Sequence, residues 1–135
     1  MPAPRRVKPK AIDATPIVLD SSCWIEFFAD TDRADLFAAA IEGVSTLVVP
    51  VLTIHEVVQK LAREAGDETA SAALSLMLRG RVVEIDLSLA LEAAVNGLPM
   101  ADSLIYATAR RHAAVLWTQD VHFDGLPAVN YFSKA

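Results

Sequence analysis

The feature that most constrains the fold is an alternation of short apolar runs with stretches of helical spacing. The runs are only a few residues long and rich in β-branched residues. Parallel strands need helical crossovers between them, and strands covered on both faces are apolar throughout. The pattern therefore predicts a three-layer α/β/α domain with a mainly parallel, four- to five-stranded sheet. The predicted strands are residues 17–20, 46–49, 82–85, 115–117 and, at an edge, 128–131; the predicted helices are 22–28, 36–43, 53–65, 68–78, 88–94 and 99–112.

The composition suits one domain preceded by a basic arm. The chain has 135 residues, of which 53% are hydrophobic and 21% charged, enough apolar material for a core. Residues 1–15 combine basic side chains with prolines and lack apolar periodicity, so we expect a flexible arm there and a folded domain at 16–135. No signal peptide or membrane-spanning run is evident, and the single cysteine, Cys23, excludes an internal disulfide framework. We therefore expect a cytoplasmic protein.

Four acids lie at positions that the predicted fold brings to the edge of the sheet formed by the carboxyl ends of the strands. Asp20 and Asp120 each follow an apolar run, Glu56 follows another at the start of a helix, and Asp102 lies at the head of the helix 99–112. In open α/β sheets, ligands bind outside the carboxyl ends of the strands. The four acids are therefore candidates for one site, although they are far apart in the sequence.

The first two acids also have local structural explanations. Asp20 could cap the helix that follows it, but Ser21 and Ser22 could do so instead, and we favour a functional role. Thr53 and Glu56 match a capping box, in which the glutamate bonds back to the start of its helix. For Glu56 alone, the capping interpretation is the stronger one.

Considered together, the acids predict a metal site. Asp102 suits the helix dipole and Asp120 suits a turn, as does Asp124 before Gly125. Several carboxylates at one rim would nevertheless repel one another at neutral pH, and a bound cation relieves that repulsion. Carboxylate ligands favour Mg²⁺ or Mn²⁺, and such ions support the hydrolysis of phosphodiester bonds. The predicted ligands are Asp20, Glu56, Asp102 and Asp120.

Charge and histidine content bear on the substrate and on the metal. The formal net charge of -5 argues against a general nucleic-acid-binding protein, but part of it lies in the predicted site, where cations offset it. The histidines lack zinc-binding spacing. His122 is near the predicted site and could touch substrate, although an ordinary loop position is the favoured explanation; the other two are His55 and His112.

Four segments, in this order and spacing, resemble the PIN domain, and most closely the small toxin ribonucleases of VapC-like toxin–antitoxin pairs. The segments are Val18–Ser22, Thr53–Glu56, Met100–Ala109 and Trp117–Phe123, and the resemblance covers about residues 16–132. It implies that Asp20, Glu56, Asp102 and Asp120 form the acidic quartet of the family. It also implies that Thr118 helps to hold the last acid or a metal-bound water, and that the two serines after Asp20 orient that acid.

The resemblance further implies a homodimeric endoribonuclease that cuts RNA with Mg²⁺ or Mn²⁺ and is silenced by a cognate antitoxin. Cleavage would leave 5′-phosphate and 3′-hydroxyl ends. His122 departs from the family pattern, because some members carry a further acid there, and Asp124 is a weak substitute for it. Two alternatives stay open: a housekeeping RNA-processing or DNA-flap nuclease, and an inactive nucleic-acid- or protein-binding PIN domain. The alanine-rich helix 68–78 is a candidate dimer surface.

Overall fold

A computed structural model gives the structure of residues 15–134, so the predicted arm lies almost wholly outside the described residues. The strands are β1 (Ile17–Leu19), β2 (Val48–Pro50), β3 (Arg81–Val83), β4 (Val115–Thr118) and β5 (Val129–Tyr131). The helices are α2 (Ser21–Phe28), α3 (Ala34–Glu42), α4 (Val51–Glu64), α5 (Asp67–Met77), α6 (Leu87–Ala94) and α7 (Met100–Arg111), with 3₁₀ turns η1 (Val44–Thr46) and η2 (Val121–Phe123). Each predicted strand and helix is found, with shifted ends. Within residues 15–134, none of the helices is long and apolar enough to cross a membrane.

The strands form a parallel layer in the order β3-β2-β1-β4-β5. Strand β4 pairs with β1 on one side and β5 on the other, and β2 pairs with β3, all in parallel. A single parallel bridge between Ile17 and Leu47 connects the three-stranded part to the two-stranded part. The prediction of a mainly parallel sheet of four to five strands is confirmed.

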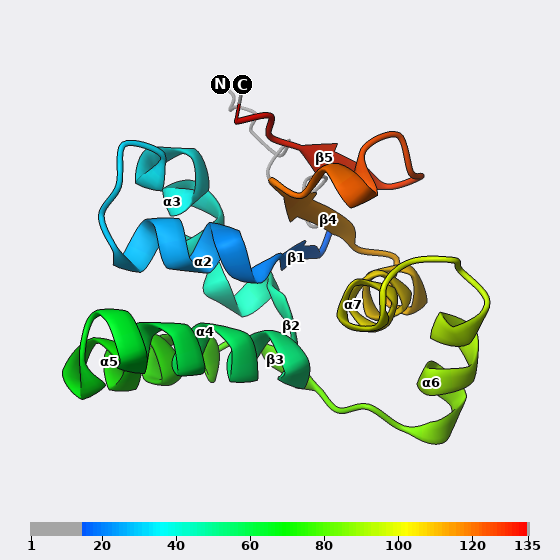
Figure 1. The fold of residues 1–135 in the computed structure, drawn as a ribbon, viewed down its shortest axis with the longest axis horizontal. Helices are drawn as coiled ribbons and strands as arrows, with labels where there is room; N and C mark the ends of the chain where they lie inside the picture. Colours follow the sequence, from blue (N-terminus) through cyan, green and yellow to red (C-terminus); the bar gives the residue numbers. More distant parts are fainter. Residues whose placement is uncertain (1–14, 135) are drawn as a thin grey trace, which may run out of the picture.

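Apolar residues on both faces of the strands account for the three layers. Val18 and Leu116 pack in one core cluster with Ile105 of α7, whereas Leu19, the next residue of β1, packs in another with Trp24 of α2. This alternation is expected for strands, whose successive side chains point to opposite faces. Figure 1 shows helices α2 to α5 on one side of the strands and α7 on the other. The α/β/α arrangement is therefore confirmed.

The segment between α3 and α4 differs from the sequence prediction. Val44–Thr46 forms a 3₁₀ turn, so the strand begins at Val48. Helix α4 begins at Val51 because Pro50, with φ -62° and ψ 138°, supplies its N-cap position. Thr53 therefore lies inside the first turn of the helix, and its hydroxyl, buried, has no hydrogen-bond partner among the described residues. The predicted capping box is wrong.

Strand β3 is an exposed edge rather than a buried strand. It pairs only with β2 among the described strands, and Val82 keeps 37% of its surface exposed. The predicted strand extended to Ile85, but the structure ends it at Val83. An edge strand has one neighbour and incomplete cover, which a short β-branched run does not reveal.

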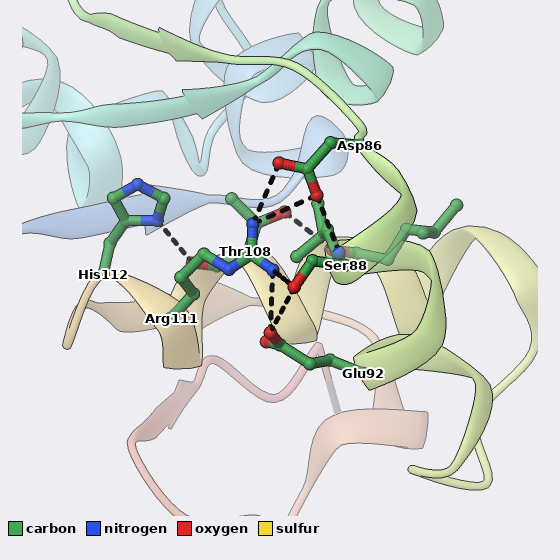
Figure 2. A network of polar contacts seen from close by, with 8 residues as sticks. Asp86, Ser88, Glu92, Thr108, Arg111 and His112 are labelled. Atoms are coloured by element: carbon green, nitrogen blue, oxygen red, sulfur yellow. Dashed lines mark hydrogen bonds and ion pairs between the residues drawn. The ribbon is translucent and has the colours of Figure 1, made fainter.

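Helix α6 is held to α7 by a polar network around Arg111 (Figure 2). The guanidinium of Arg111 donates to Glu92 Oε2 at 2.7 Å and to Ser88 Oγ at 2.9 Å, and it lies 3.3 Å from Asp86 Oδ1. Asp86 also accepts from the Leu89 N–H at 2.8 Å and so caps α6. The network engages the guanidinium of Arg111 in contacts within the fold, so this group is only partly available to a ligand.

Candidate active site

The four predicted acids meet in one pocket of about 330 Å³ at the carboxyl ends of the strands. They come from four separate segments: the end of β1, helix α4, the first turn of α7 and the residue pair after β4. The pocket is lined by Asp20, Ser21, Ser22, Glu56, Asp102, Gln119, Asp120 and Lys134. The structure therefore brings together acids that the sequence separates by up to a hundred positions.

Asp20 is the most enclosed of these acids, with 6% of its surface exposed. One carboxylate oxygen accepts from the Ser21 N–H at 2.9 Å and the other accepts from Thr118 Oγ1 at 2.8 Å. Burial raises the pKa of Asp20 to about 6, although both hydrogen bonds oppose the rise. Asp20 is thus the cap of α2 as well as a lining residue of the pocket, and neither serine replaces it as the cap.

Thr118 supports two of the acids from a fully buried position. Its hydroxyl donates to the Asp20 carboxylate and accepts from the Asp120 N–H at 2.9 Å. It therefore fixes the side chain of the first acid and the backbone of the last one. The family resemblance associated Thr118 with the last acid, and the structure adds the bond to Asp20.

Glu56 is free of the helix-capping role that the sequence suggested. It lies in α4, beyond the first turn, and its Oε1 atom is buried with no hydrogen-bond partner among residues 15–134. Burial raises the pKa of Glu56, the Ser21 side chain opposes the rise, and the charge of Asp102 adds to it. A buried, unpartnered carboxylate oxygen that lines a polar pocket is suited to a cation or a bound water.

His122 lies between the other two acids. Its Nδ1 atom is 3.0 Å from Asp102 Oδ2 and 3.2 Å from Asp120 Oδ1. The hydrogen bond to Asp102 and the charge of Asp120 raise the pKa of His122. Burial raises the pKa of Asp102, while His122 opposes that rise. The sequence left His122 as an ordinary loop residue, and the structure makes it part of the acidic site.

The pocket has the properties expected of a cation site. Three of the four buried side-chain atoms that lack partners in the described chain belong to its lining: Ser22 Oγ, Glu56 Oε1 and Gln119 Nε2. Burial outweighs mutual repulsion as the cause of the raised pKa values of Asp20 and Asp102. Both effects oppose ionisation, and a divalent cation would relieve both. The carboxylate oxygens therefore fit Mg²⁺ or Mn²⁺.

Two lining residues, Gln119 and Lys134, were not predicted from the sequence. Arg33 donates to Gln119 Oε1 and also to the carbonyls of Phe132 and Ser133, at 3.1 Å and 3.2 Å. These bonds hold the segment that follows β5, which carries Lys134 to the pocket. Gln119 could have been suspected from its place beside Asp120, but no local pattern marks Lys134.

The comparisons with known proteins agree with this geometry. The sequence matches the family model of the PIN domain over residues 17–128. No significant match is found among curated protein sequences.

Several solved structures share the fold. A toxin–antitoxin complex from Klebsiella pneumoniae aligns with 22% identity and a TM-score of 0.72, over 87% of this chain and 98% of that one. VapC20 of Mycobacterium tuberculosis, a toxin that cleaves the sarcin–ricin loop, aligns with 21% identity and a TM-score of 0.61, over 73% and 84% of the two chains. VapBC2 from Rickettsia felis, bound to a promoter DNA fragment, aligns with 15% identity and a TM-score of 0.66, over 88% and 98%. The family match spans most of the sequence, and the chain therefore belongs to the PIN domain family.

Proposed function

We propose that this protein is a divalent-metal-dependent endoribonuclease and the toxin of a type II toxin–antitoxin pair. The observation that carries the proposal is the pocket in which four acids from four segments meet around buried polar atoms without partners. Solved structures of the same fold include toxins and toxin–antitoxin complexes, which supports a toxin role and a cognate antitoxin as partner. We expect it to act in the cytoplasm, where RNA is found.

The chain itself supplies four carboxylates as oxygen ligands. Asp20, Asp102 and Asp120 would hold Mg²⁺ or Mn²⁺, and Glu56 would hold the ion or a water beside it. When bound, such an ion polarises the phosphate, lowers the pKa of a water molecule and stabilises the leaving oxygen. Thr118 would keep Asp20 in position, because its hydroxyl bond to that carboxylate is buried.

Lysines beside the acids support an RNA substrate despite the net charge of -5. Lys134 lines the acidic pocket. It also lines an adjoining pocket of about 360 Å³, which Lys60 of α4 lines as well. The two pockets share Ser21 and Ser22. Two ammonium groups next to the acids would bind the phosphates that flank the cleaved bond.

An apolar stripe on α6 supports the homodimer. Leu87, Leu91 and Val95 follow one another at intervals of four residues, and they keep 75%, 62% and 86% of their surfaces exposed. Met100, at the start of α7, is 77% exposed. Helix α5, the candidate surface from the sequence, packs Ala70, Ala73 and Met77 into the core, and the large apolar residue that it exposes is Leu78, at its C-cap. We therefore assign the dimer surface to α6.

The decisive experiment compares RNA cleavage by the full chain and by Asp20→Asn, each with Mn²⁺. The control is Asp32→Asn, because Asp32 is an exposed acid outside the pocket. We expect cleavage by the wild type and the control, its loss on adding EDTA, and a loss of at least about a hundredfold in Asp20→Asn, the upper part of the range for disturbing a metal site. Equal cleavage by all three proteins would refute the proposal.

A further inference from the structure

A three-residue turn fixes His122 against two of the acids. Asp120 caps η2, and its Oδ1 atom accepts from the His122 N–H at 2.9 Å. The residue after His122, Phe123, is fully buried in the core and anchors the turn. The imidazole belongs to a loop, but the backbone that carries it is held at both ends of the turn.

The distances from His122 Nδ1 to the two carboxylates, which also suit hydrogen bonds, are close to the distance between neighbouring ligands around one ion. His122 Nδ1 is 3.0 Å from Asp102 Oδ2 and 3.2 Å from Asp120 Oδ1. One potential ligand atom from each of the three residues lies within 4.8 Å of the others. In an octahedral site with bonds of about 2.1 Å, adjacent ligand atoms are about 3.0 Å apart. The three side chains can therefore occupy one coordination sphere.

Independent features of the pocket also indicate a ligand. Glu56 Oε1 and Ser22 Oγ line the same pocket and are buried without partners among the described residues. They are not part of the cluster around His122, and a bound ion or water would give each of them a polar partner. The site therefore has both a ligand set and unpartnered polar atoms beside it.

We propose that His122 is a nitrogen ligand of the metal, together with Asp102 and Asp120, and that it makes the site prefer Mn²⁺ to Mg²⁺. Mg²⁺ prefers oxygen ligands, whereas imidazole favours first-row transition ions, and carboxylates also accept Mn²⁺. The ligand form is the neutral imidazole with its proton on Nε2. The inference rests on the metal dependence proposed above, and it adds the identity of one ligand and the preferred ion.

Electron paramagnetic resonance of Mn²⁺ bound to the full chain tests the ligand directly. Electron spin echo modulation detects the ¹⁴N nucleus of a coordinated imidazole. We expect this modulation in the wild type and in His112→Asn, because His112 lies at the far end of α7 from Asp102. We expect it to vanish in His122→Asn. Titration should show Mn²⁺ affinity reduced about tenfold or more in His122→Asn, with Mg²⁺ affinity nearly unchanged.

The outcomes separate this inference from the proposed function. Mn²⁺ binding without ¹⁴N modulation, or with modulation that persists in His122→Asn, would overturn the role of His122 and leave the metal site in place. Absence of Mn²⁺ binding in the wild type would overturn both. His122→Asp provides a second variant: it replaces the nitrogen ligand by an oxygen ligand, so we expect it to bind metal and to favour Mg²⁺ more than the wild type does.

Discussion

The Thr118 hydroxyl and the Asp20 carboxylate form a buried hydrogen bond of 2.8 Å between residues 98 positions apart. The bond joins the ends of β1 and β4, which are neighbours in the sheet. A threonine that ends one strand thus determines where the acid that ends the next strand lies. Thr118 therefore positions the Asp20 carboxylate.

Thr118→Val should lower the stability of the folded protein and also disturb the position of Asp20. Valine has a similar shape but cannot donate to Asp20 or accept from the Asp120 N–H. At pH 7.5 in EDTA, we expect the free energy of unfolding to fall by about 1.5–3 kcal/mol, the usual worth of a hydrogen bond to a charged group. Thr118→Ser keeps the hydroxyl and is the control. Equal stability of the valine and serine variants in urea denaturation would contradict this role.

Because the pKa of Asp20 is raised, the free energy of unfolding of the metal-free protein should fall as the pH rises. Its pKa rises from the ordinary 3.8 to about 6 on folding. The folded state therefore binds the proton more tightly, and this stabilisation is fully present below about pH 3.8 and lost as the pH rises through about 6. The free energy of unfolding lost in this way is roughly 3 kcal/mol at most.

Asp20→Asn removes that titration, because the amide stays neutral. In EDTA at pH 7.5, we expect the variant to unfold at a higher urea concentration than the wild type, with the difference shrinking towards pH 4. One hydrogen bond to the amide side is lost, which costs about 1 kcal/mol and reduces the gain. Asp32→Asn, the exposed control, should follow the wild type at each pH. An unchanged difference across this pH range would show that Asp20 does not titrate as described.

Some site residues could be predicted because their position depends on strand ends alone. Asp20 ends the predicted strand 17–20 and Asp120 lies three residues beyond the predicted strand 115–117, so the parallel topology was enough to bring them to one rim. Lys134 depends on the path of the chain after β5, which Arg33 fixes through the carbonyls of Phe132 and Ser133. Contacts of this kind, between residues about a hundred positions apart, have no local sequence pattern.

Glu56 shows how a local pattern can mislead. The spacing of Thr53 and Glu56 fits a capping box, but the proline before Val51 starts the helix two residues earlier. The first turn of α4 in the structure therefore includes Thr53, and Glu56 lies beyond that turn and lines the pocket. Predicted helix starts are uncertain by this much, and here the shift separates a structural role from a functional one.

Glu56→Gln tests that separation. Because no capping bond is lost, we expect the unfolding free energy in EDTA to stay equal to that of the wild type or rise slightly. We expect RNA cleavage and Mn²⁺ affinity to fall. Glu42→Gln, at an exposed glutamate outside both pockets, should change neither cleavage nor affinity. A loss of about 1 kcal/mol in Glu56→Gln, the usual cost of removing a cap, would contradict the structure around α4.

The stripe on α6 predicts where the dimer can be broken. Leu91 lies in the middle of the stripe and is 62% exposed, so Leu91→Asp would place a charge inside the interface without disturbing the core. We expect light scattering after gel filtration to show a dimer for the wild type and a monomer for Leu91→Asp. Leu78, 57% exposed at the end of α5, provides the matched control, and Leu78→Asp should stay dimeric. The reverse result would place the interface on the helix that the sequence first suggested, and a monomeric wild type would refute the dimer itself.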